Sequence, residues 1–388
     1  MKKKIISAML GIAMLGTLLT GCGGSDSSES KETTAKATEV EKTEASGGDE
    51  TTEAKADDAA ASGSHKIGVS MPTKDLQRWN QDGENMKSQL ESAGYEVDLQ
   101  FASNDIQTQV SQVENMISGD CELLVIASID GDSLGTVLAQ AKEKNIPVIA
   151  YDRLIMNSDA VTYYATFDNY LVGQKQGEFI EEKLDLKNAE GPFNMEIVTG
   201  DPGDNNVNFF YGGAMDVLKP YIDSGKLVVK SGQIEKADVA TANWATDAAQ
   251  ARFEAIISSY YSDGTNLDVV LASNDSTALG VANALAANYT GTYPILTGQD
   301  CDIASVKNIL ADKQSMSIFK DTRDLASKVV EMVDAIINGK EIEGLDTTTY
   351  DNGKGIVPSY LCEPVFADKN NYKEILIDSG YYQESDLQ

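Results

Sequence analysis

Histidine is almost missing from this chain of 388 residues, since its single histidine is His65. Catalytic triads and many zinc sites depend on histidine side chains. The sequence therefore excludes a His-based triad and a His-ligated metal site. It also has no Walker A lysine motif, and no GxGxxG follows the first predicted strand, so the common nucleotide-binding signatures are absent. We expect no cofactor and no metal.

Basic residues are scarce relative to acidic ones: 31 Lys and Arg stand against 61 Asp and Glu, a formal net charge of −30. A surface of this charge repels nucleic acids and anionic lipids. We therefore expect no nucleic-acid partner. The charge favours a soluble protein whose ligand is a neutral or cationic small molecule.

Cysteine is also rare, with four residues at wide spacing: Cys22, Cys121, Cys301 and Cys362. Such spacing is neither a disulfide framework nor a zinc pattern. The last three are expected to pack as small apolar residues. A single disulfide among them stays open as an alternative.

The N-terminus has the parts of an export signal in residues 1–21. A basic MKKK precedes the apolar stretch IISAMLGIAMLGTLL, which is too short for a stable membrane span. The following LTGC resembles the lipobox of bacterial lipoproteins, which implies cleavage before Cys22 and lipidation of that residue. An ordinary secretory signal that happens to contain a cysteine is the alternative.

Residues 22–65 are expected to be a disordered acidic linker held to the membrane through Cys22. Beyond that cysteine the segment has no aromatic residue and a single valine, so it cannot bury a core. The folded part is then tethered at the outer face of the cytoplasmic membrane.

The rest of the chain alternates short apolar strands with helical stretches, which predicts parallel sheets covered by helices on both faces. A second series of alternating strands and helices begins after residues 162–169, so we expect two α/β lobes. The predicted strands are KIGVSM (66–71), YEVDLQFA (95–102), ELLVIASI (122–129), PVIAYD (147–152) and TYYATFDN (162–169), then FNMEIVTG (193–200), KLVVKSG (226–232), DVVLASN (268–274), PILTGQD (294–300) and SMSIFKD (315–321).

Polar side chains follow strand after strand. They are Asp152 and Arg153, Asp204 and Asn206, Asn274, Asp300, and Lys320. Ligands of open α/β sheets bind outside the carboxyl ends of the strands, so these groups predict a polar pocket between the lobes, together with Arg78. Helix capping is the alternative for Asp204 and Asp275, which precede predicted helices.

The pocket's chemistry suits a sugar, since planar Asp, Asn and Arg groups can each bracket two neighbouring hydroxyls. The C–H face of a sugar ring stacks on an aromatic side chain. The chain has two tryptophans, Trp79 and Trp244, and both fall beside predicted pocket residues. A place in the core is the alternative for each.

These segments together resemble the type I periplasmic sugar-binding proteins, in their xylose-binding and multiple-monosaccharide-binding branch. The resemblance covers residues 66–388 in order and is carried by KIGVSMPTKDLQRW, LLVIASIDG, VIAYDRLI, YYATFDN, GDPGDNN, ASNDSTALG, GQDCDIASVKNI and SIFKDTRDLA. It implies an α/β fold of two Rossmann-like doubly wound lobes joined by a three-crossover hinge. It also implies a monomer that delivers an aldose, of the xylose, glucose, galactose or arabinose type, to the permease of an ABC importer.

The resemblance also implies boundaries and contacts. The crossovers should lie near residues 167–170, 297–300 and 319–321. The N-terminal lobe would hold 66–168 and 299–320, the C-terminal lobe 169–298 and 321–366, and a tail 367–388. The implied sugar contacts are Arg78, Asp152, Arg153, Asp204, Asn206, Trp244, Asn274, Asp300 and Lys320, with Trp79 as a further candidate.

Other functions are weighed against this one. Asp152 and Asp300 could serve as a glycosidase carboxylate pair, but the resemblance implies capture of sugar without chemistry, so we expect no enzyme. A sugar-sensing receptor that docks on a sensor kinase or chemoreceptor would use the same ligand site. A DNA-binding repressor would need a basic helix-turn-helix ahead of residue 66, where the sequence has an export signal and an acidic linker.

Overall fold

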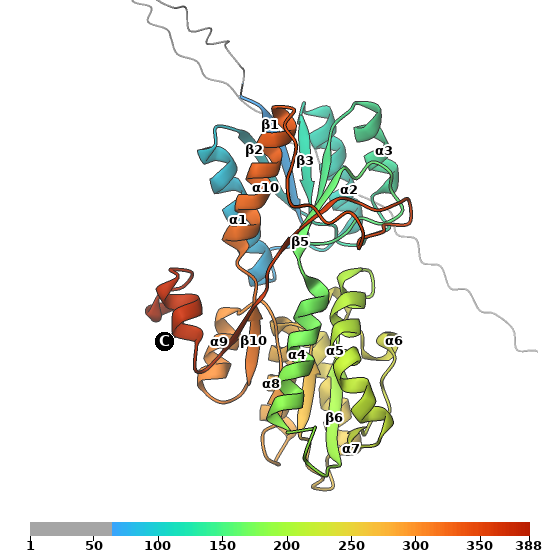
Figure 1. The fold of residues 1–388 in the computed structure, drawn as a ribbon, viewed down its shortest axis with the longest axis vertical. Coiled ribbons are helices and arrows are strands. Elements are labelled where there is room, and N and C mark those ends of the chain that lie inside the picture. Colours follow the sequence, from blue (N-terminus) through green and yellow to red (C-terminus); the bar gives the residue numbers. More distant parts are fainter. Residues whose placement is uncertain (1–63) are drawn as a thin grey trace, which may run out of the picture. The chain divides into compact units, whose positions relative to one another are not determined.

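The computed structural model of the protein describes residues 64–388, which form two α/β lobes (Figure 1). The expected signal peptide, the lipidated Cys22 and nearly all of the expected linker lie outside the described residues. His65, placed at the end of the linker by the sequence, already belongs to the fold. Its Nδ1 lies 2.8 Å from a Glu122 carboxylate oxygen, and its carbonyl accepts the amide of Glu96.

The first lobe is built on a parallel sheet whose strand order is β11-β5-β4-β3-β1-β2. Its strands are β1 (Lys66–Met71), β2 (Glu96–Phe101), β3 (Leu123–Ile126), β4 (Val148–Tyr151), β5 (Tyr163–Phe167) and β11 (Ser359–Cys362). Its helices are α1 (Gln77–Ser92), α2 (Ile106–Ser118), α3 (Gly135–Glu143) and α10 (Thr322–Ile337).

Alternation along each central strand explains why helices cover both faces of this sheet. In β3, Leu123 and Val125 join the core under α1 and α10, whereas Leu124 and Ile126 join the core under α2 and α3. Successive side chains of a strand point to opposite faces, so an uninterrupted apolar strand must be covered twice. The apolar runs in the sequence therefore required a layer of helices on each side.

The second lobe repeats this plan with a parallel sheet in the order β7-β6-β8-β9. Its strands are β6 (Phe193–Val198), β7 (Leu227–Val229), β8 (Val269–Ala272) and β9 (Ile295–Leu296), and the pair β10 (Met316–Phe319) and β12 (Val365–Asp368) lies beside them. Its helices are α4 (Asn169–Lys183), α5 (Asn206–Asp223), α6 (Lys236–Val239), α7 (Thr246–Tyr260), α8 (Asp275–Asn288) and α9 (Ile303–Leu310), with a 3₁₀ turn η1 (Ala242–Trp244).

Three crossovers join the lobes, two of them where the sequence predicts them. The chain passes from β5 to α4 at residues 167–169 and from β10 to α10 at residues 319–322. The prediction of a crossover at 297–300 is wrong, because Gln299 bridges Ile318 in parallel and so keeps β9 and β10 in one lobe. The third crossover lies between β11 and β12, at residues 362–365.

The predicted lobe boundaries are wrong for two segments, each of which lies in the lobe opposite to the predicted one. Residues 299–320 continue the second lobe. Helix α10 and strand β11 belong to the first lobe, because Leu325 and Val329 pack in the core beside α1 and β11 pairs with β5. An amphipathic helix such as α10 must bury one face, but its pattern does not say against which sheet.

The predicted tail, residues 367–388, is a packed part of the second lobe. Strand β12 pairs antiparallel with β10, and it is followed by a single π-helical segment, η2 (Lys373–Asp378), and a 3₁₀ turn, η3 (Glu384–Leu387). Leu376 and Tyr382 are buried in a cluster with Val306 of α9. Figure 1 shows this segment beside α9.

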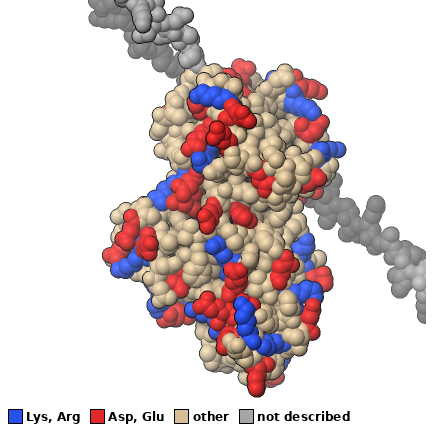
Figure 2. Space-filling model, in the orientation of Figure 1, with Lys and Arg blue, Asp and Glu red and all other residues tan. Residues whose placement is uncertain are grey.

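The cysteines of the described chain are unpaired. Cys121 and Cys301 are buried, Cys362 is partly buried, and all three are free thiols, as expected for small apolar residues. None of the helices in residues 64–388 is both long and apolar enough to cross a membrane. Acidic and basic side chains are interspersed over the face drawn in Figure 2.

Candidate functional site

A cavity lies where the carboxyl ends of strands from both sheets meet. In each sheet it adjoins the point where the strand order reverses, between β1 and β3 and between β6 and β8, which is where open α/β sheets bind ligands. The empty space in this region is about 430 Å³, a figure that includes space open to solvent. All ten predicted contacts line it: Arg78, Trp79, Asp152, Arg153, Asp204, Asn206, Trp244, Asn274, Asp300 and Lys320.

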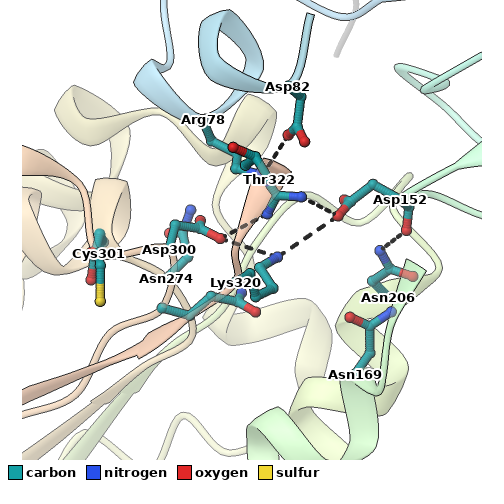
Figure 3. Close-up of polar contacts among 12 residues, drawn as sticks. Arg78, Asp82, Asp152, Asn169, Asn206, Asn274, Asp300, Cys301, Lys320 and Thr322 are labelled. Carbon is teal, nitrogen blue, oxygen red and sulfur yellow. Dashed lines mark hydrogen bonds and ion pairs between the residues drawn. The ribbon is translucent and has the colours of Figure 1, made fainter. Parts of the chain in front are cut away.

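Arg78 of α1 is the centre of the site's charge network (Figure 3). Its Nη2 donates to Asp152 at 2.6 Å and its Nη1 to Asp300 at 3.0 Å. Its Nε donates to Asp82, one turn further along the same helix, and Asp82 also accepts the hydroxyl of Tyr151. The guanidinium therefore joins carboxylates of both lobes, because Asp152 follows β4 and Asp300 follows β9.

The carboxyl groups around Arg78 titrate differently. Burial alone would raise the pKa of Asp152, but Arg78, Lys320 and Arg153 outweigh it and hold that pKa at about 2. Burial raises the pKa of Asp82 to about 6, with Arg78 opposing and Asp152 reinforcing the shift. Asp152 is thus firmly ionised in the cavity wall.

Two further cations face the cavity. Lys320, at the crossover from β10 to α10, lies 3.1 Å from Asp300 and 3.8 Å from Asp152. Arg153 pairs with Asp204 across the lobes at 3.0 Å, and its guanidinium carbon lies 4.9 Å from the ring centre of Trp79. Buried charges are tolerated when they are paired in this way.

Trp244 is held against the backbone that follows β6. A Cβ atom on Gly200 would lie 2.0 Å from the indole ring, so only glycine allows the ring to sit there. The indole Nε1 donates to Asp204 at 3.2 Å, and the Trp244 carbonyl accepts the hydroxyl of Ser276 at 2.8 Å. The ring is therefore fixed before any ligand contact.

For both tryptophans, the predicted position at the cavity and the alternative position in the core apply together. Trp79 and Trp244 are each 4% exposed, and both belong to hydrophobic clusters while lining the cavity.

Helix capping explains part of the strand-end chemistry. Asn274 is the cap of α8, and its Oδ1 accepts the amide of Thr277 at 3.0 Å. Asp204 accepts the amide of Asn206 at 2.9 Å, but it is not the cap of α5, which is Asn205. Asp275 is not the cap; its carboxylate lies behind the cavity and accepts the amide of Asp302. For Asn274, capping the helix and facing the cavity are compatible, whereas the capping alternative is wrong for Asp204 and Asp275.

Direct hydrogen bonds hold the lobes together over the cavity. Asn206 of α5 donates to the carbonyl of Asp152 at 2.7 Å and accepts the hydroxyl of Tyr164 at 3.0 Å. The amide of Gly131 donates to the carbonyl of Gly203 at 3.1 Å. Because these contacts cross from one lobe to the other, the structure is a closed arrangement.

Sequence reasoning missed six residues of the site, namely Leu76, Asp82, Phe210, Ser276, Gln299 and Asp302. All but Asp82 line the cavity. Asp82 was detectable, since it stands four residues after Arg78 on one helix face. Burial and the neighbouring Asp300 raise the pKa of Asp302 to about 7, and its Oδ1 has no hydrogen-bond partner within residues 64–388.

One further pattern was overlooked: GDSLG at residues 131–135 has the spacing of a hydrolase nucleophile elbow. In the structure the Ser133 hydroxyl donates to the carbonyl of Asp130 at 2.9 Å. The chain's single histidine pairs with Glu122 instead. The pattern is therefore not accompanied by the base that a serine nucleophile needs.

The cavity can serve a polyhydroxylated neutral molecule. Guanidinium and ammonium groups donate hydrogen bonds, and carboxylates accept them, so each hydroxyl of a ligand finds both kinds of partner. The aromatic rings and Leu76 supply apolar surface for C–H groups. Among the described residues, no group of three His, Cys, Asp or Glu side chains is placed to hold a metal ion.

Comparison with known proteins agrees with this chemistry. The sequence model of a family described as periplasmic binding protein domain matches residues 67–341. The chain is 52% identical over 325 residues to the multiple sugar-binding periplasmic receptor ChvE of Rhizobium radiobacter, covering 83% of this chain and 92% of that protein. It is 36% identical over 322 residues to the D-xylose-binding periplasmic protein of Escherichia coli K12, covering 83% and 92%.

Among solved structures, the chain is similar to an ABC transporter solute-binding protein from Clostridium phytofermentans with bound β-D-glucose. The sequence identity is 74% and the TM-score 0.83, over 83% of this chain and 100% of that one.

Proposed function

The chain belongs to the periplasmic binding protein family, and from that premise we propose that its cavity captures one aldose monosaccharide and presents it to an ABC importer. The observation that carries the proposal is the convergence of ten predicted sugar contacts on one cavity between two lobes. They come from the ends of β4, β6, β8, β9 and β10 and from α1, α5 and η1. Residues from segments so far apart in the sequence would not all line one cavity by chance.

The charges in the cavity favour a neutral ligand. Arg78, Arg153 and Lys320 are each already paired with carboxylates of the site. An anionic ligand would compete with those carboxylates and face their repulsion, whereas hydroxyl groups can bond to both partners of an ion pair. Glucose and xylose are the first candidates, because relatives of this chain are named for them.

Closure of the lobes is the proposed capture step. A ligand favours closure only through contacts that the open form lacks, and residues from both lobes line this cavity. A dissociation constant near 1 μM corresponds to about −8 kcal/mol, which a few charge-assisted hydrogen bonds and one stacked ring can supply after ordering costs. The importer then recognises the closed form as the form that holds a sugar.

Capture without chemistry fits the site better than glycoside hydrolysis. A glycosidase needs one carboxyl group protonated as general acid, and such groups have raised pKa values. Asp152 has its pKa held at about 2, so it cannot serve as that acid at neutral pH. Asp302, with a pKa of about 7, lines the same cavity, so the preference for capture rests on the comparisons with sugar-binding proteins. Release of nitrophenol from aryl glycosides by the purified protein would contradict this assignment.

We also propose that the mature protein is a monomer anchored by diacylation of Cys22 on the outer face of the cytoplasmic membrane. The support is sequence alone, namely the basic, apolar and LTGC segments ahead of that residue. Palmitate labelling of the expressed protein should be lost in Cys22→Ala, which should then be released from membranes. Labelling that persists in the variant would refute the anchor.

The binding proposal is tested by isothermal calorimetry with xylose, glucose, galactose and arabinose. We expect saturable one-to-one binding of at least one aldose, and its loss in Asp300→Ala. The control is Lys219→Ala, whose side chain pairs with Asp223 on the exposed surface of α5, and this variant should bind normally. A flat titration with every aldose would refute the proposal.

A further inference from the structure

The C-terminal segment, residues 365–388, reaches from the second lobe to the first. It is anchored in the second lobe by β12 on β10 and by Leu376 and Tyr382 in the cluster with Val306. Its partners in the first lobe are on α1 and α10. This segment is therefore placed to influence how the two lobes meet.

The hydroxyl of Tyr382 is the point of contact. It accepts the side-chain amides of Gln77 at 2.8 Å and Gln81 at 3.1 Å, both on α1, and it donates to the carbonyl of Cys301 at 3.0 Å. A phenol has one donor and two acceptor positions, so all of them are used. The residue is 5% exposed, which leaves water little access to these bonds.

The bonded residues are sequence neighbours of the site. Gln77 directly precedes Arg78, and Cys301 directly follows Asp300, the pair that forms a 3.0 Å ion pair across the cavity. Gln77 is doubly engaged, because its Oε1 accepts the amide of Ile303 at 3.1 Å. One hydroxyl thus ties together the two segments that carry this ion pair.

The ring of Tyr382 is held in place independently of its hydroxyl. It packs edge-on against Tyr381 with ring centres 4.8 Å apart, and Tyr381 packs in the same manner against Phe319 at 4.7 Å. The guanidinium of Arg323, on α10, lies 4.9 Å from the Tyr381 ring centre. Removing only the Tyr382 oxygen therefore leaves the packing intact.

We propose that Tyr382 is a positioning residue: its hydroxyl joins α1 to the loop after β9 and thereby slows release of the ligand from the closed cavity. The ligand part of this proposal rests on the proposed function. The bonds to Gln77 and Gln81 cross between the lobes, so they stabilise the closed arrangement. Their loss speeds reopening and leaves the encounter of sugar with the open form unchanged.

The test compares Tyr382→Phe with the wild-type protein by stopped-flow tryptophan fluorescence using the aldose that binds best. Tyr382→Phe should raise the dissociation rate constant about tenfold, which corresponds to ~1.4 kcal/mol, with the association rate constant unchanged. The matched control is Tyr293→Phe, also in the second lobe, whose hydroxyl has no hydrogen-bond partner among the described residues. It should match the wild type in both constants.

A second readout separates this proposal from the proposed function. In Tyr382→Phe, hydrogen exchange should speed up at residues 301–303 with or without sugar, because Cys301 lies in the same lobe as Tyr382. Exchange at residues 77–81 should speed up in the sugar-bound protein, in which the lobes are closed. An unchanged dissociation rate, or unchanged exchange at these amides, would overturn the role of Tyr382. Should the wild-type protein bind no aldose, the proposed function fails, and exchange at residues 301–303 alone decides whether the Tyr382 hydroxyl holds the loop after β9.

Discussion

Replacing Gly200 by alanine tests how the site holds its indole. The new Cβ atom would lie 2.0 Å from Trp244 Cζ2 and 2.1 Å from its Cε2 and Cη2, whereas ordinary contacts begin near 3.4 Å. The ring must therefore retreat by roughly 1.4 Å, because the backbone after β6 is fixed by the bond from the Thr241 amide to the Gly200 carbonyl at 3.0 Å. Such overpacking costs about 1–3 kcal/mol.

The displacement should weaken sugar binding about 10- to 100-fold, which is ~1.4–2.8 kcal/mol. It moves the proposed stacking surface and strains the 3.2 Å bond from the Trp244 indole to Asp204. Calorimetry gives the affinity, and tryptophan emission reports the change around the ring. Both should differ from wild type in the same variant.

Gly212→Ala is the matched control. Gly212 lies in α5 with no atom within 4 Å of the added Cβ, so this change should leave affinity unchanged and stabilise the helix by about 0.5–1 kcal/mol. Wild-type affinity in Gly200→Ala would refute the assignment of Trp244 to the ligand surface.

Further predictions concern charge and thiols. Arg78→Met should lower the melting temperature by on the order of 10 °C, since it leaves three buried carboxyl groups without their shared partner, at a cost of about 3–5 kcal/mol. A melting temperature within 2–3 °C of wild type would contradict that network. Asp302→Asn should raise stability relative to wild type at pH 8 but not at pH 4. The reason is that the pKa of Asp302 rises from 3.8 to about 7 on folding, so the wild type binds this proton when folded and loses stability as pH rises between those values. Equal differences in melting temperature between Asp302→Asn and the wild type at pH 4 and pH 8 would contradict the raised pKa of Asp302. Cys121 and Cys301 should react with a thiol reagent only after unfolding, without prior reduction, because both are buried free thiols. Rapid labelling of the native protein would contradict their burial.

The site was more predictable from sequence than the lobe boundaries. Asp152, Asp204, Asn274 and Asp300 follow apolar strands, and parallel strands of one sheet bring their carboxyl ends to one edge whatever the details of packing. Arg78 lies on a helix rather than at a strand end, so the strand-end pattern alone did not place it in the site. These residues meet at the cavity as predicted, and their contact with sugar stays a prediction.

The segments that were assigned to the wrong lobe show which structural features a sequence pattern does not specify. The amphipathic pattern of α10 specifies an apolar face but not the sheet it covers, and β11 is too short to signal its partner strand. The role of Tyr382 could not be predicted from the sequence for a similar reason. Its segment is polar and turn-rich, and only the fold brings it next to Gln77, 305 residues away in the sequence.

The most direct test of the account is a crystal structure of the protein with the aldose that binds most tightly. The account predicts one pyranose ring between the lobes, hydrogen-bonded to Arg78, Asp152 and Asp300 and packed against Trp244. A sugar bound elsewhere, or a ring that touches residues of one lobe alone, would contradict it.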